Sequence, residues 1–188
     1  MAILPITILG DTVLHARANE VTSFDDDLRT LVADMFDTMA EAPGVGLAAP
    51  QVGVSQRLFV YSWSDDDDNE HRGVAINPTL WLSPLTVDPL DEEEEAEGCL
   101  SFPGERFPLR RAERVILDAV DLDQKPFTIH AEGWLARIFQ HEYDHLDGVL
   151  YVDRLEYSLA KQAQKIVRKQ SWGTPGHSWL PGRDHPEG

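Results

Sequence analysis

Apolar residues recur every three or four positions in three stretches of the chain, which is the spacing of a helix face. In the first stretch, Ser23 is a candidate N-cap, residues 25–27 form an acidic first turn, and Pro43 marks the end. Its apolar positions are Leu28, Leu31, Val32, Met35, Phe36 and Met39. The second stretch covers residues 133–145 and the third residues 155–170. We therefore predict three amphipathic helices.

Shorter apolar runs lie between these helices and predict β-strands. Residues 57–62 and 74–77 have the composition of buried strands. Residues 114–121 and 127–130 flank a polar turn, so we predict that they form a hairpin. Residues 6–14 are apolar but are interrupted by a glycine and an aspartate, which predicts a short extended piece.

The remaining segments predict loops and one domain boundary. Two acidic runs, 65–68 and 91–95, predict solvated, self-repelling loops, and scattered prolines predict irregular chain over residues 80–89. Nothing repeats and no long linker interrupts the chain, so we predict one domain over residues 1–170. The tail, residues 171–188, has no regular pattern, but its large apolar residues lead us to expect packing on the body or a neighbour. These are Trp172, Trp179 and Leu180.

Composition narrows the functional classes. The 188 residues carry 16 Lys and Arg against 33 Asp and Glu, a net charge of −17, which disfavours free DNA as a partner. No run of about 18 apolar residues predicts a membrane span. The single cysteine excludes an internal disulfide framework, and the N-terminus has no basic, apolar leader. We therefore expect a soluble cytoplasmic protein.

The segment of residues 140–145, QHEYDH, predicts a metal site on the second helix. His141 and His145 are four residues apart, so both rings face one side, and Glu142 lies close enough to act on a bound water. A catalytic site normally needs a third protein ligand. Asp147 and Glu156 are downstream candidates, but the longer HExxHxxGxxH pattern is absent.

Cys99 is the alternative third ligand. It lies in the segment EGCLS, residues 97–101, directly after a glycine that permits close backbone approach. A divalent metal would stabilise its thiolate despite the acidic neighbours. A further segment, GVGLAAPQ at residues 44–51, combines small residues with Gln51, whose amide can donate to a developing oxyanion. It lacks the Lys-Ser/Thr of a phosphate-binding loop.

In this order and with these spacings, GVGLAAPQ, EGCLS and HEYDH resemble the three motifs of peptide deformylase. The resemblance covers residues 3 to 170. It implies an α+β fold in which antiparallel strands pack around a central metal-binding helix, with an N-terminal and a C-terminal helix. It also implies a metal-dependent hydrolase that removes the N-formyl group from the N-terminal formylmethionine of newly made polypeptides and releases formate.

The resemblance assigns roles to the motif residues. Cys99, His141 and His145 would bind one divalent ion, Fe²⁺ natively, with Ni²⁺, Co²⁺ or Zn²⁺ as alternatives. Glu142 would be the general acid and base. Gln51 and the backbone N–H of Leu100 would form the oxyanion hole. The expected substrate-binding residues are Gly44, Val45, Gly46, Gly98, Arg106, Trp134 and Ile138.

Other charged residues receive more local expectations. Arg137 takes a place where an apolar residue is expected, so its stem would line the substrate pocket with the charge at the rim. Arg111 is expected to pair with Asp144. The last helix region is basic, and the resemblance implies contact with the ribosome near the nascent-chain exit. Its cations are Arg154, Lys161, Lys165, Arg168 and Lys169, opposed by Glu156.

Two other functions remain as alternatives. A peptidase that cuts internal amide bonds would take its third ligand after His145 and would not need Cys99. A catalytically inactive relative would be a metal-binding or ribosome-associated module. The presence of Glu142 and Gln51 opposes the second alternative, because binding alone needs neither a base nor an oxyanion donor.

Overall fold

The computed structural model describes residues 2–184. The α-helices are α1 (Asp26–Glu41), α2 (Gly133–Leu146) and α3 (Tyr157–Lys169), and the 3₁₀ helices are η1 (Thr12–His15), η2 (Ala49–Val52) and η3 (Tyr151–Arg154). The longer strands are β3 (Leu58–Ser64), β4 (Glu70–Leu82), β6 (Phe102–Pro108), β7 (Arg114–Val120) and β8 (Pro126–Glu132). The shorter strands are β1 (Ile6–Thr7), β2 (Gly46–Ala48), β5 (Ala96–Cys99) and β9 (Ser178–Trp179). The expected α+β fold is confirmed.

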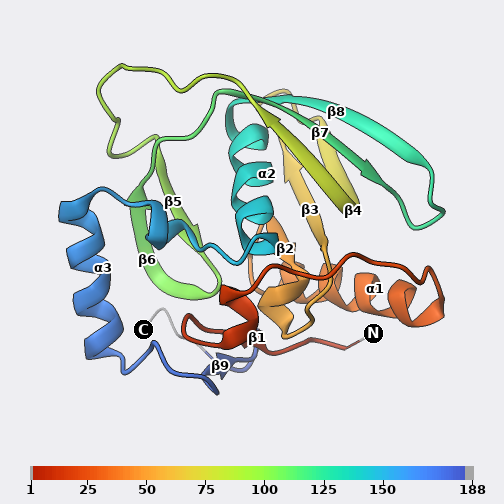
Figure 1. The fold of residues 1–188 in the computed structure, drawn as a ribbon, viewed down its shortest axis with the longest axis horizontal. Helices are drawn as coiled ribbons and strands as arrows, with labels where there is room; N and C mark the ends of the chain where they lie inside the picture. Colours follow the sequence, from red (N-terminus) through yellow and green to blue (C-terminus); the bar gives the residue numbers. More distant parts are fainter. Residues whose placement is uncertain (1, 185–188) are drawn as a thin grey trace.

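The main sheet has the strand order β2-β3-β4-β7-β8, and every neighbouring pair is antiparallel. Helix α2 lies at the centre of the molecule between this sheet and the β5–β6 hairpin (Figure 1). Apolar side chains of the sheet and the helix form one buried cluster that includes Phe59, Leu117 and Phe139. Because α2 is buried on nearly all sides, the polar side chains that it carries must find partners inside the protein.

Helix α1 follows the predicted apolar pattern. Its buried residues include Leu28, Val32 and Met35, which lie on one face. The predicted N-cap was wrong: Asp25, not Ser23, caps the helix, and its carboxylate accepts a 3.0 Å hydrogen bond from the Leu28 N–H. A carboxylate is the better group at this end because it also interacts favourably with the helix dipole.

Several strands differ from the sequence prediction. Strand β4 continues well beyond residues 74–77, and its pairing with β7 shifts between Ile76 and Thr79. Pro78 lies at this irregularity, where the missing N–H costs no ladder hydrogen bond. Residues 80–82 were predicted to be irregular and belong to β4. Strands β2, β5 and β6 were not predicted at all.

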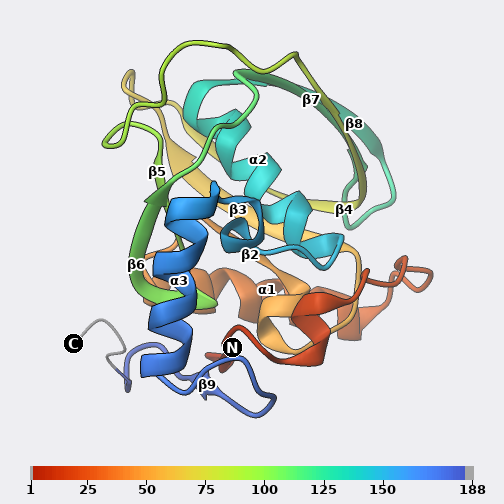
Figure 2. The ribbon, with the colours of Figure 1, turned by 60° about the vertical axis from the view of Figure 1, so that its left-hand side comes forward.

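The chain ends come together in a second small sheet. Strand β9 pairs antiparallel with β1, and Trp179 lies opposite Ile6. A two-residue strand thus forms in a tail whose sequence shows no regular pattern, and residues 185–188 of that tail lie outside the described residues. Helix α3 lies on the side of the β5–β6 hairpin that faces away from α2 (Figure 1). From there it runs down toward β9 (Figure 2). Within residues 2–184, each helix is too short or too polar to cross a lipid bilayer.

Candidate metal centre

Three buried side chains from two elements converge at the centre of the molecule. Cys99 ends strand β5, and His141 and His145 lie one turn apart on α2. The Cys99 Sγ atom is 3.3 Å from His145 Nε2, and the three potential ligand atoms all lie within 4.8 Å of one another. One thiolate and two imidazoles suit a divalent transition metal and leave a coordination position for solvent. The residues therefore fit the implied ion.

Glu97 holds the first histidine in place. Its Oε1 atom lies 3.1 Å from His141 Nδ1, which leaves His141 Nε2 for the metal. Burial alone would raise the pKa of Glu97, but hydrogen bonds from His141 and Arg111 outweigh it and hold the pKa well below its usual value. Sequence reasoning missed this residue. Glu97 and Cys99 are two positions apart on a strand and are both buried, so they point to the same side.

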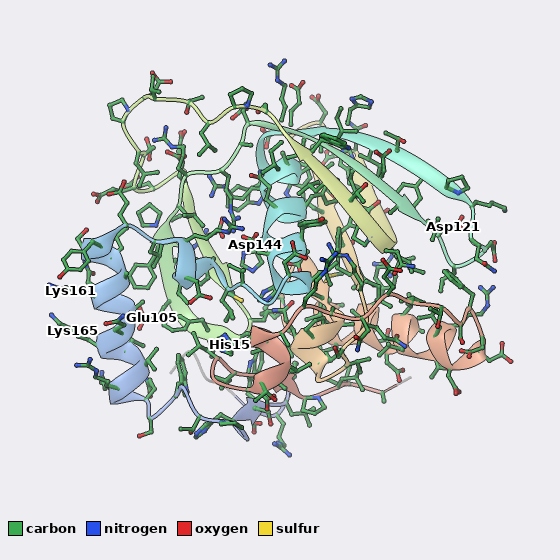
Figure 3. The ribbon with its side chains drawn as sticks, in the orientation of Figure 1. His15, Glu105, Asp121, Asp144, Lys161 and Lys165 are labelled. Carbon is green, nitrogen blue, oxygen red and sulfur yellow. The ribbon has the colours of Figure 1, made fainter. Side chains whose placement is uncertain are left out.

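A network of charged side chains supports Glu97 and the helix. Arg111 donates to Glu97 at 2.6 Å and to Asp144 at 2.6 Å, which confirms the expected pairing of Arg111 with Asp144. Asp144 lies on α2 in the interior (Figure 3). Arg154 donates two further hydrogen bonds of 2.6 Å to Asp144. Arg154 was grouped with the cations of the last helix. Because its guanidinium pairs with Asp144, it does not belong to the basic surface of α3.

Substitution of Arg111 by Met is expected to lower the free energy of unfolding by about 3 kcal/mol, because two buried carboxylates, Glu97 and Asp144, then each lose one of the cations that pair with them. Arg154→Met is the control. Its side chain is 49% exposed whereas that of Arg111 is 6% exposed, so the expected loss is below about 1 kcal/mol. Urea unfolding of the two variants measures the difference. Equal losses would contradict a structural role for the buried network.

Glu142 is a buried carboxylate beside the metal ligands. Its Oε2 atom has no hydrogen-bond partner among the described residues, and burial raises the pKa of the group to about 7. Gly46 makes room for it, because a Cβ at this position would overlap the carboxylate. The first motif therefore contacts the third motif at Glu142.

Gln51 presents its amide N–H₂ to the same centre. Its Oε1 atom accepts a 2.8 Å hydrogen bond from the Ala48 N–H, which fixes the orientation of the amide. Its Nε2 atom lies 3.3 Å from Ser101 Oγ and 3.8 Å from Cys99 Sγ. The N–H of Leu100 belongs to the peptide that follows Cys99, so both donors lie next to the predicted ligands.

A cavity of about 550 Å³ opens onto this centre. It is lined by all of the residues that the sequence suggested for substrate binding, namely Gly44, Val45, Gly46, Gly98, Arg106, Trp134 and Ile138. The expectation for Arg137 was wrong in one respect. Its side chain lines the cavity, but its guanidinium is not at the rim: it donates to Glu97 at 2.9 Å and to the Leu109 carbonyl at 2.8 Å.

The acidic run at residues 91–95 is also partly tied to this region. Glu95 pairs with Arg110 at 3.0 Å, and its carbonyl accepts a hydrogen bond from Arg137 at 3.2 Å. Only part of the run is therefore a solvated loop.

Within the cavity lining, the guanidinium of Arg137 also lies over the Trp134 ring, 5.5 Å from its centre.

Known proteins match both the sequence and the structure. The polypeptide deformylase family profile matches residues 3–161. The peptide deformylase of Tropheryma whipplei strain TW08/27 is 51% identical over 191 residues, covering 95% of this chain and 94% of that protein. The crystal structure of a Legionella pneumophila peptide deformylase is 44% identical with a TM-score of 0.75, covering 90% of this chain and 96% of that one.

A further solved structure is the Synechococcus elongatus peptide deformylase in complex with actinonin. It is 38% identical, has a TM-score of 0.74, and covers 90% of this chain and 86% of that one. The chain has the Cys-His-His site at the corresponding motifs. It therefore belongs to the peptide deformylase family, hydrolases that remove the formyl group from N-formylmethionine.

Proposed function

We propose that this deformylase acts in the cytoplasm on the N-formylmethionyl ends of nascent polypeptides and uses Fe²⁺ as its native ion. The convergence of Cys99, His141 and His145 beside Glu142, whose Oε2 atom has no hydrogen-bond partner among the described residues, carries the proposal. The family resemblance favours Fe²⁺, and the same donor set accepts Ni²⁺, Co²⁺ or Zn²⁺.

Glu142 is the proton carrier in this proposal. Its carboxylate takes a proton from the water that attacks the formyl carbon and returns it to the leaving nitrogen as the C–N bond breaks. The products are formate and a peptide with a free amino group. The divalent ion, when bound, supplies an acidified water and a positive charge near the formyl oxygen. The raised pKa of Glu142 suits a group that must both accept and donate a proton.

Two N–H donors stabilise the charge that develops on the formyl oxygen. Gln51 offers Nε2, held in place through Ala48, and Leu100 offers its backbone N–H. Each well-aimed donor contributes about 3 kcal/mol to transition-state stabilisation. The methionine side chain fits the apolar part of the cavity, formed by Val45, Trp134 and Ile138.

Formate release from a formyl-Met-Ala peptide by protein purified anaerobically with Fe²⁺ tests the proposal. We expect turnover with the formylated peptide and none with an acetylated peptide of the same sequence, in which an internal amide remains available. Cleavage of the internal amide would support the peptidase alternative. Absence of formate release by protein with confirmed metal content would refute the proposed function.

The basic surface of α3 is the proposed contact with the ribosome. The opposite face of helix α3 packs through Leu159, Ala163 and Ile166 against the apolar cluster that contains Cys99. Its cations are exposed, and Lys161 and Lys165 point away from the body of the protein (Figure 3). A local cationic surface on a chain of net charge −17 fits an RNA phosphate backbone better than the rest of this surface does.

Replacing Lys161, Lys165, Arg168 and Lys169 by Gln is expected to weaken ribosome co-sedimentation. The slope of log affinity against log salt concentration should become smaller in magnitude by about 3 to 4. Each phosphate contact releases about one counterion on binding, and the variant makes four fewer such contacts. Lys125→Gln, at the exposed turn between β7 and β8, is the control and should bind as the unmodified protein does. Unchanged co-sedimentation of the quadruple variant would argue against this surface as the contact.

A further inference from the structure

Consecutive residues beside the metal centre are held by different parts of the chain. Cys99 points into the centre, where its Sγ atom lies 3.3 Å from His145 Nε2. The carbonyl of the next residue, Leu100, accepts a 2.9 Å hydrogen bond from the indole N–H of Trp179. The carbonyl of Ser101 accepts one of 2.9 Å from the Leu9 N–H. The backbone after Cys99 is therefore fixed by both ends of the chain.

Trp179 reaches Leu100 because β9 is anchored on β1. Besides the pairing of Trp179 with Ile6, the Ile8 N–H donates to the His177 carbonyl at 2.9 Å. Trp179 is 9% exposed and packs in the same cluster as Met39 and, at its edge, Leu100. The deformylase family profile ends at residue 161, so this contact comes from a segment outside it.

Strand β1 links this segment to the first motif as well. The Thr7 hydroxyl donates to the Gln51 carbonyl at 3.0 Å. The Gln51 amide in turn contacts Ser101 Oγ at 3.3 Å. The two residues that carry the proposed oxyanion donors, Gln51 and Leu100, are thus both held by hydrogen bonds from the paired strands β1 and β9.

We propose that Trp179 is a positioning residue for the Leu100 N–H. This inference rests on the proposed role of that N–H in stabilising the formyl oxyanion. The direction of the N–H is set by the backbone angles at Cys99 and Leu100, since the peptide units are planar. The Cys99 side is held in the metal centre, and the Leu100 carbonyl is held by the Trp179 indole. Loss of the indole bond would free the carbonyl and widen the range of N–H directions.

Trp179→Phe removes the N–H donor and keeps an aromatic ring in the core. Trp172→Phe is the matched control, because Trp172 also lies in the tail and packs edge-on against Phe102, with ring centres 5.2 Å apart. The measurements are kcat and KM for formyl-Met-Ala release, the metal content and the unfolding temperature. We expect kcat to fall by about five- to tenfold for Trp179→Phe, with KM and metal content unchanged, and by less than about twofold for Trp172→Phe.

An isostere of Trp179 in which sulfur replaces the ring N–H gives a second test that keeps the shape of the side chain. It should reproduce the loss in kcat even where Trp179→Phe is less stable. Unchanged kcat in the isostere, a change confined to KM, or an equal loss in Trp172→Phe would overturn the proposal. Formate release by the unmodified protein tests the proposed function separately, and the ratio of variant to unmodified kcat tests the role of Trp179.

Discussion

Glu142→Ala is expected to lower kcat for formate release by about 10²- to 10⁴-fold, the usual contribution of general acid–base catalysis. The carboxylate is buried, one of its oxygens has no hydrogen-bond partner among the described residues, and it lies next to two of the metal ligands. No other described carboxylate combines these features: Glu97, the nearest alternative, already binds His141 and Arg111. The metal content of Glu142→Ala should remain at one ion per chain.

Glu142→Gln separates chemistry from packing. The amide has nearly the same size as the carboxylate and fills the space beside Gly46, but it cannot accept the proton. It should therefore lose as much activity as Glu142→Ala while keeping the stability of the unmodified protein. Activity of the Gln variant within about tenfold of the unmodified protein would assign the base to another group.

Cys99→Ala is expected to remove the metal and, with it, turnover. Loss of an outer partner of a ligand typically costs about 10- to 100-fold in metal affinity, and loss of a ligand itself costs more. The metal content should therefore fall below one ion per chain after dialysis, and formate release should fall with it. Elemental analysis of anaerobically purified protein measures the first effect, and the formyl-Met-Ala assay measures the second.

Two variants control this experiment. Cys99→Ser keeps the size of the side chain but replaces a good ligand by a poor one, so it should also lose the metal. His130→Ala removes an exposed histidine of β8 that lies outside the cluster and should keep the metal. An active, metal-loaded Cys99→Ala protein would favour a downstream ligand and the peptidase alternative.

Much of the fold could be predicted because it depends on local periodicity. The apolar stripe of α1 and the helical spacing of His141 and His145 are properties of short segments. Strands β5 and β6 escaped prediction because their residues, among them Gly98 and Pro103, do not alternate between apolar and polar. Strand β9 consists of only two residues, and its structure depends on pairing with β1 at the other end of the chain.

In the candidate site, too, the local features could be predicted from the sequence and the long-range contacts could not. The histidine pair was predictable from its spacing. The meeting of Cys99 with that pair depends on how β5 packs against α2: the sequence offered Cys99 as one of several candidate third ligands, and the family resemblance singled it out. The supporting contacts were harder still. Glu97 is shared by Arg111 and Arg137, and neither arginine is near it in sequence. Partners of this kind depend on tertiary packing, which sequence spacing does not reveal.

The pairing of β1 with β9 has a consequence for the order in which the protein assembles. Synthesis proceeds from the N-terminus, so β1 emerges from the ribosome long before its partner strand exists. Helix α2 and the β5–β6 hairpin can meet while residues that follow α2 are still being added, but the indole of Trp179 reaches Leu100 only afterwards. The backbone beside Cys99 therefore receives its last hydrogen bond as a late event in the maturation of each new molecule.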